Sequence, residues 1–341
     1  MVADQQEVFV IKPAVRHAVP QSVAIIGPTF SGKTYGALLL AAGMVKPGEK
    51  IGFIDTEHGR GSMYADDPDI RAAIKRESWF SADAPYGVIE IDPPFHPQRY
   101  IAAIRTFDAA GVSLVITDSG SHAWNGTGGG LDMKEGDKSW VKAKLWSKRF
   151  MHEIIYSRMH HIICLRAQEK TKIVGTGKAQ EYIPLGIAPI CEKTFTFDLS
   201  LTFQVEGEIE NKPATHLAWP MKWPKAMNPM FANWTKQLLT PSIGQRIREW
   251  NDSAPVEDAT VRLTRQSQIA ALEGLESYQA WFTGQRPGAR KVLIDTGTHA
   301  ANKVTAAGVR LEDDDATEQP QEEIDAALAA KFERDQREGK V

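Results

Sequence analysis

Short apolar runs and amphipathic stretches alternate along the first 250 residues. The apolar runs are rich in β-branched residues, which is typical of buried strands, and the stretches between them repeat apolar residues at helical spacing. The predicted strands are Val23–Ile26, Ile51–Ile54, Val88–Ile91, Val112–Thr117 and His161–Leu165. The predicted helices are Lys33–Met44, Pro68–Glu77, Pro97–Ala110 and Lys138–Arg158. This alternation predicts an α/β fold with a mostly parallel central sheet flanked by helices.

The pattern changes after residue 195. Thr196–Val205 and His216–Trp219 have the composition of strands and predict antiparallel strands at one edge of the sheet. A polar stretch that contains Pro241 and Pro255 indicates a boundary, and helical spacing resumes from Thr264. The sequence therefore predicts a core at 1–250, a linker at 251–263, a small helical module at 264–309 and an acidic, disordered tail at 310–341.

Composition excludes several classes of protein. Hydrophobic residues make up 42% and charged residues 24% of the chain, which is ordinary for a globular protein. The two cysteines are too few for a disulfide scaffold, and the histidines lack metal-ligand spacing, so we expect no zinc. No apolar stretch approaches the ~20 residues that span a bilayer, and the first residues do not resemble a secretory signal. We expect a cytoplasmic protein with no membrane partner.

Charge is distributed unevenly. Residues 310–341 hold 11 acidic and 5 basic residues, whereas residues 138–178 hold 10 basic and 2 acidic residues. A basic region beside an acidic tail is typical of a protein that binds polyanions and carries its own competitor. The alternative is that the tail only improves solubility.

A phosphate-binding loop follows the first predicted strand. The stretch Gly27–Thr34 matches GxxxxGK[ST] between a strand and a helix, which is the context that this motif requires. Backbone N–H groups would surround the phosphates, Lys33 would contact the β- and γ-phosphates, and the Thr34 hydroxyl would bind Mg²⁺. The predicted nucleotide-binding residues are Gly27, Pro28, Thr29, Phe30, Ser31, Gly32, Lys33, Thr34 and Tyr35. The expected ligands are ATP and Mg²⁺.

Two further strands end in carboxylates. Asp55 and Glu57 follow one strand, and Asp118 ends another. Hydrolysis needs a carboxylate that polarises the attacking water, and we assign this role to Glu57, with Asp55 as the alternative. We assign Asp118 to Mg²⁺. Because Ser119 and not Glu follows Asp118, the general base is not expected on that strand.

These motifs resemble the core of the RecA-type recombinases over roughly residues 20–225. The family's F-I-D-A-E-H run is similar to Phe53–His58, and its V-V-D-S run is similar to Ile116–Ser119. The resemblance implies that Tyr64 stacks on adenine and that Gln168, with Arg166 as the alternative, is a polar sensor. It also implies two DNA-binding loops, at Gly126–Gly136 and Glu169–Ala188. The predicted DNA-binding residues are Lys134, Lys138, Arg166, Lys170, Lys172 and Lys178.

The resemblance has further consequences for assembly. Lys222 and Lys225 are similar in place to lysines that reach a neighbouring subunit's γ-phosphate, which implies a filament or ring of identical subunits. No polymerisation helix precedes the first strand, so the chain looks more like the compact RecA-like ATPases of bacteriophage recombination. The expected partners are single-stranded DNA and a single-strand binding protein.

Three functions follow from these patterns. The first is a DNA-dependent ATPase of recombination or annealing, the second is a ring motor or loader related to replicative helicases, and the third is a small-molecule kinase. A kinase is disfavoured because the chain lacks an arginine-rich lid. DNA-stimulated ATP turnover separates the first from the third, and strand unwinding selects the second.

Overall fold

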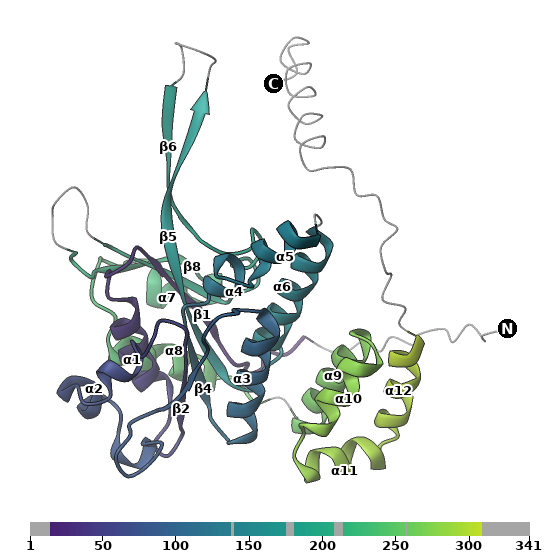
Figure 1. Cartoon of the computed structure of the whole chain (residues 1–341). Coiled ribbons are helices and arrows are strands. Elements are labelled where there is room, and N and C mark those ends of the chain that lie inside the picture. The colour runs from purple at the N-terminus through teal and green to yellow at the C-terminus, as the bar shows by residue number, and fades with distance from the viewer. Residues whose placement is uncertain (1–13, 138–139, 175–180, 208–213, 257, 309–341) are drawn as a thin grey trace. The chain divides into compact units, whose positions relative to one another are not determined.

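The computed structural model describes residues 14–137, 140–174, 181–207, 214–256 and 258–308. The chain divides into two compact units (Figure 1). The larger unit comprises Met1–Arg262 with Gly284–Arg286, and the smaller comprises Leu263–Thr283 with Pro287–Val341. The predicted acidic tail, 310–341, lies outside the described residues.

The larger unit is built on one mostly parallel sheet, which confirms the predicted α/β fold. The strand order is β3-β2-β4-β5-β1-β7-β8; β1 to β5 and β7 pair in parallel, and β8 pairs with β7 antiparallel. The strands are β1 (Ser22–Gly27), β2 (Ile51–Asp55), β3 (Gly87–Glu90), β4 (Leu114–Asp118), β5 (His160–Val174), β6 (Glu181–Pro189), β7 (Leu201–Val205) and β8 (Ala218–Lys222). β7 and β8 therefore form the predicted antiparallel pair at this edge, with β7 itself parallel to β1.

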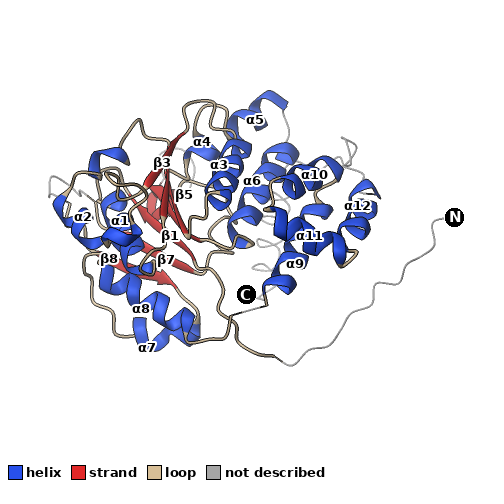
Figure 2. Ribbon diagram, turned by 90° about the horizontal axis from the view of Figure 1, so that it is seen from below, coloured by secondary structure: helices blue, strands red, loops and turns tan. Residues whose placement is uncertain are grey.

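Helices cover both faces of this sheet, as Figure 2 shows. The helices of the larger unit are α1 (Lys33–Met44), α2 (Pro68–Ala73), α3 (Pro97–Ala109), α4 (His122–Asn125), α5 (Gly130–Asp137), α6 (Trp140–Ile155), α7 (Asn228–Phe231) and α8 (Pro241–Asp252). Val23 and Ile25 of β1 face the core beneath α1 and α8, whereas Ala24 and Ile26 face the core beneath α3 and α6. Because alternate side chains enter two cores, each central strand is apolar throughout.

Two helices extend into the predicted linker at 251–263. Helix α8 ends at Asp252 and α9 (Ala259–Leu272) begins before Thr264. Pro241 was expected to mark a boundary, but it occupies the first turn of α8, where a missing N–H breaks no hydrogen bond. The division of the chain into four domains stays a prediction.

The described parts of the two predicted DNA-binding loops include regular structure. Part of the first, Gly126–Gly136, is helix α5, which starts where Gly130 leaves room for the ring of Trp124; a Cβ on Gly130 would lie 2.5 Å from Trp124 Cε3. In place of the second, β5 continues past the sheet and pairs with β6 from Ala167–Pro189 to Val174–Glu181. We call this two-stranded extension the β5–β6 ribbon (Figure 1).

The smaller unit consists of helices. These are α9, α10 (Leu275–Thr283), α11 (Pro287–Asp295) and α12 (Thr298–Gly308). Tyr278, Trp281 and Leu293 are buried in its core, and Tyr278 donates or accepts a hydrogen bond with His299 Nδ1 at 3.0 Å. This aromatic core gives the unit an interior of its own.

Helices α1 and α8 cross at two glycines. A Cβ on Gly43 would lie 1.8 Å from the Pro241 carbonyl oxygen, and a Cβ on Gly244 would lie 2.1 Å from the Leu40 carbonyl oxygen. Since the atoms that a Cβ would meet belong to the backbone, rotation of a neighbouring side chain cannot make room for a side chain at either glycine.

Gly43→Ala is expected to lower the free energy of unfolding by at least ~1–3 kcal/mol, the typical cost of overpacking a core. Urea titration followed by circular dichroism measures the change. Gly136→Ala in α5 is the matched control, because a Cβ there meets nothing within 4 Å. Equal stability of the two variants would contradict the close crossing.

Candidate functional site

The phosphate-binding loop joins β1 to α1 as the motif predicts. Gly32 adopts φ 85°, a left-handed conformation that favours glycine, and α1 begins at the next residue. A Cβ on Gly32 would also lie 2.9 Å from His216 Nδ1, so His216 contacts the loop from the segment before β8. Lys33 is buried, its Nζ donates to the Pro28 carbonyl, and burial lowers its pKa.

Thr34 and Asp118 meet beneath the loop. Thr34 Oγ1 donates to Asp118 Oδ2 at 2.5 Å, and burial raises the pKa of Asp118 to about 6. A hydroxyl and a carboxylate are the oxygen ligands that Mg²⁺ prefers, so this pair fits the predicted ion. Among the described residues no group of three His, Cys, Asp or Glu could hold a metal, so Mg²⁺ would depend on phosphate oxygens and water for its other ligands.

Glu57 lies between two arginines. Its side chain is only 6% exposed. Arg166 at the end of the β5 segment within the sheet donates to Glu57 Oε1 from Nε at 3.0 Å and from Nη2 at 2.8 Å. Arg60 Nη1 pairs with the other oxygen, Oε2. Both carboxylate oxygens of the predicted general base are therefore held by guanidinium groups.

Both carboxylate oxygens of Asp55 accept hydrogen bonds from the backbone. Its Oδ1 accepts from the Glu57 backbone N–H at 2.7 Å, and its Oδ2 accepts from the Gly61 N–H at 2.8 Å. Between these two bonds the chain turns through left-handed residues, His58 at φ 56° and Gly59 at φ 79°. Asp55 fixes the turn that carries Glu57, and this arrangement favours Glu57 over Asp55 as the base.

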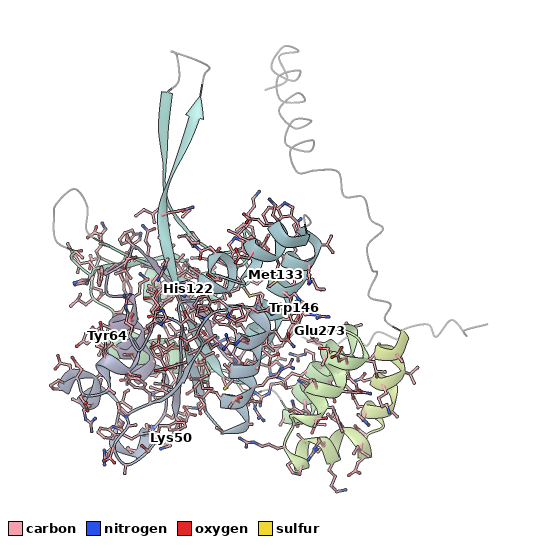
Figure 3. All side chains as sticks on the ribbon, in the orientation of Figure 1. Lys50, Tyr64, His122, Met133, Trp146 and Glu273 are labelled. Atoms are coloured by element: carbon pink, nitrogen blue, oxygen red, sulfur yellow. The ribbon has the colours of Figure 1, made fainter. Side chains whose placement is uncertain are left out.

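One cavity of about 430 Å³ contains these groups. Its polar end is lined by Lys33, Thr34, Glu57, Arg60, Asp118 and Arg166. Its apolar end is lined by Tyr35, Leu39, Met63, Tyr64, Leu238 and Leu239. The Tyr64 and Tyr35 rings lie 5.6 Å apart, and Figure 3 labels Tyr64 on the α1 side of the sheet. An apolar end next to a phosphate loop is suited to a purine base, so Tyr64 stays a candidate for adenine stacking.

Three predicted catalytic residues lie elsewhere. Gln168 is exposed at the base of the ribbon and does not line the cavity, whereas Arg166 does. This favours the alternative, Arg166, and the sensor assignment stays a prediction. Lys222 Nζ donates to the carbonyls of Thr196, Phe197 and Leu199 within its own chain, and its role toward a neighbouring subunit stays a prediction. Lys225 is exposed at the start of a 3₁₀ turn, Lys225–Met227.

The predicted DNA-binding residues are spread over several elements. Lys134 lies on α5 with Nζ 5.3 Å from the centroid of the Trp140 ring, and that ring stacks on Trp124 at 6.0 Å. The Trp124 ring is thus packed within the protein. Lys170 and Lys172 belong to the part of β5 that forms the ribbon, whereas Lys138 and Lys178 fall outside the described residues. Arg166 faces the cavity, so its prediction as a DNA ligand is not supported.

Sequence reasoning missed Arg60, His216 and the two leucines at the apolar end of the cavity. Arg60 could have been found, because it follows Glu57 by three residues in one turn. His216, Leu238 and Leu239 approach the loop only through the tertiary fold.

The fold and this site define a P-loop nucleoside triphosphatase with a RecA-like α/β fold. The family model of the AAA domain matches residues 19–203, so the chain belongs to that family. A similar solved structure is a KaiC-like protein from the hyperthermophilic archaeon Pyrococcus horikoshii, with 14% identity over 62% of this chain and 91% of that chain and a TM-score of 0.36. No curated protein matches. No helix within the described residues is long and apolar enough to cross a membrane.

Proposed function

We propose that this protein hydrolyses ATP and couples hydrolysis to binding of single-stranded DNA. The main supporting observation is the continuity of strand β5. The strand contains Arg166, which pairs with Glu57, and it continues into the β5–β6 ribbon, which includes Lys170 and Lys172. A nucleotide site and a basic projection thus share one element.

Each residue of the site has a separate role in hydrolysis. Lys33 binds the β- and γ-phosphates, and the Thr34 hydroxyl and the Asp118 carboxylate would hold Mg²⁺. Mg²⁺ neutralises charge on the phosphates when bound. Glu57 accepts a proton from the attacking water, and its burial keeps competing water away from its oxygens.

The DNA role is supported by charge and by backbone geometry. Residues 138–178 carry a net charge of +8 in the sequence, and Lys170 and Lys172 belong to the part of β5 that forms the ribbon. Lysines bind phosphates without regard to base sequence. We propose single-stranded DNA as the ligand, with assembly of identical subunits and cooperation with a single-strand binding protein as further expectations.

The test is ATP turnover with and without single-stranded DNA, in the wild type and in Lys170→Gln/Lys172→Gln. We expect DNA to stimulate the wild type, and the variant to lose stimulation while it keeps its basal rate. Its binding to DNA should also depend less on salt, by about 0.7 in log–log slope for each lost phosphate contact.

Lys75→Gln/Lys303→Gln is the charge-matched control, since both lysines are exposed and lie outside the ribbon. DNA stimulation that survives in the ribbon variant would contradict a DNA role for the ribbon. Unwinding of a duplex by the wild type would favour the ring motor or loader.

A further inference from the structure

Arg60 occupies a position between the general base and the phosphate loop. Its Nη1 pairs with Glu57 Oε2, and its side chain lines the same cavity as Lys33 and Asp118. Its Cζ lies 5.4 Å from the centroid of the Phe30 ring, and Phe30 is the fourth residue of the phosphate loop. The Arg60 guanidinium therefore lies where the end of a triphosphate would enter.

The turn that carries Arg60 is fixed by the protein. The two backbone hydrogen bonds to Asp55 hold residues 57 and 61, and the left-handed residues His58 and Gly59 set the direction of the chain between them. Glu57 and Arg60 thus point into the cavity from one short segment. A rotation of the Arg60 side chain, without backbone movement, can change its partner.

Glu57 is a weaker base toward water while both of its oxygens are paired with arginines, because each guanidinium stabilises the charged carboxylate. Arg166 donates two converging N–H groups to Oε1, whereas Arg60 pairs with Oε2 through one nitrogen. The contact with Arg60 is the one that can be exchanged. A γ-phosphate carries more negative charge than a carboxylate and accepts from a guanidinium through several oxygens.

We propose that Arg60 is a ligand of the γ-phosphate within the same subunit, and that it leaves Glu57 Oε2 when a triphosphate binds. Arg166 keeps Oε1 and orients the carboxylate, and the released Oε2 faces the attacking water. The cavity thereby distinguishes ATP from ADP, because only the triphosphate offers Arg60 a better partner. This inference rests on the proposed nucleotide site, not on the proposed DNA role.

A purely structural role for Arg60 makes a different prediction. If Arg60 only holds Glu57 in place, its removal affects nucleotide binding through Glu57 and has no effect once Glu57 lacks its charge. If Arg60 binds the γ-phosphate, its removal weakens triphosphate binding in either background. Comparison of single and double variants separates the two roles.

The experiment is isothermal titration calorimetry of the full chain with Mg²⁺ and without DNA, using ATPγS and ADP as probes. We expect Arg60→Gln to bind ATPγS about tenfold or more weakly, the loss expected for one charge-assisted hydrogen bond, and to bind ADP within about twofold of the wild type. Glu57→Gln should bind ATPγS more tightly than the wild type, because Arg60 then has no carboxylate to leave. Arg60→Gln/Glu57→Gln should again lose about tenfold relative to Glu57→Gln.

Arg246→Gln is the control, because Arg246 is exposed on α8 and does not line the cavity. Unchanged ATPγS binding in Arg60→Gln, an equal loss for ADP and ATPγS, or disappearance of the loss in the Glu57→Gln background would each overturn the proposal. A wild type that binds neither probe would overturn both this inference and the nucleotide site. A wild type that shows the expected ratios but no DNA stimulation would refute only the DNA role.

Discussion

Glu57→Gln is expected to bind ATP and to hydrolyse it ~10²–10⁴-fold more slowly than the wild type, the usual cost of losing a general base. The amide keeps the size of the side chain and loses the negative charge that makes the carboxylate a base. The fold should survive, since Asp55 holds the turn through backbone N–H groups that the substitution leaves in place. Release of phosphate under single-turnover conditions measures the chemical step directly.

Asp55→Asn is the informative comparison for Glu57→Gln. Asp55 accepts two backbone hydrogen bonds and is buried, so its substitution is expected to destabilise the turn as well as lower the rate. Thermal denaturation should therefore distinguish the two variants. A wild-type rate in Glu57→Gln would show that the base lies elsewhere in the cavity.

The central fold could be predicted because its strands are buried on both faces. Ile51–Asp55 and Leu114–Asp118 have fully buried side chains, and such segments appear in sequence as uninterrupted apolar runs. Their carboxylates could be predicted too, since parallel strands that end together bring their terminal residues to one edge. The register pairs Asp55 with Asp118, as this argument requires.

The β5–β6 ribbon could not be predicted from the same signal. The residues after Ala167 show no regular apolar period, so their sequence resembles a loop. The placement of the predicted sensor Gln168 depends on the same segment. Gln168 lies two residues beyond Arg166, about 6.6 Å further along the strand, and this distance places it outside the cavity. The approach of His216 to the phosphate loop and of Leu239 to Gly36 of α1 could not be predicted from their local sequence.

The arginines around Glu57 change how the role of the acidic motif is interpreted. The sequence pattern alone presents Glu57 as a free carboxylate next to a phosphate loop. In the structure both of its oxygens are paired with guanidinium groups, those of Arg60 and Arg166. Activation of Glu57 then requires a ligand that competes for a guanidinium, and a triphosphate has the necessary charge.

Lys33→Ala is expected to abolish measurable ATP turnover, a loss of at least ~10²-fold, because removal of one preorganised charge at a reacting phosphoryl group has effects of this order. No other residue of Gly27–Thr34 carries a positive charge. The variant should fold, since burial lowers the pKa of Lys33 and the folded protein therefore bears a cost for its charged form. Circular dichroism and thermal denaturation check the fold, and a coupled assay measures turnover.

Lys75→Ala is the matched control for Lys33→Ala, because Lys75 is exposed and lies outside the cavity, so its turnover should equal that of the wild type. The ammonium of Lys33 donates to the Pro28 carbonyl within the loop, and it must turn from that carbonyl to the phosphates when nucleotide binds. Lys33→Ala should therefore weaken ADP and ATPγS binding together, whereas Arg60→Gln should weaken ATPγS binding alone. A folded Lys33→Ala protein with wild-type turnover would contradict the assignment of this cavity as the nucleotide site.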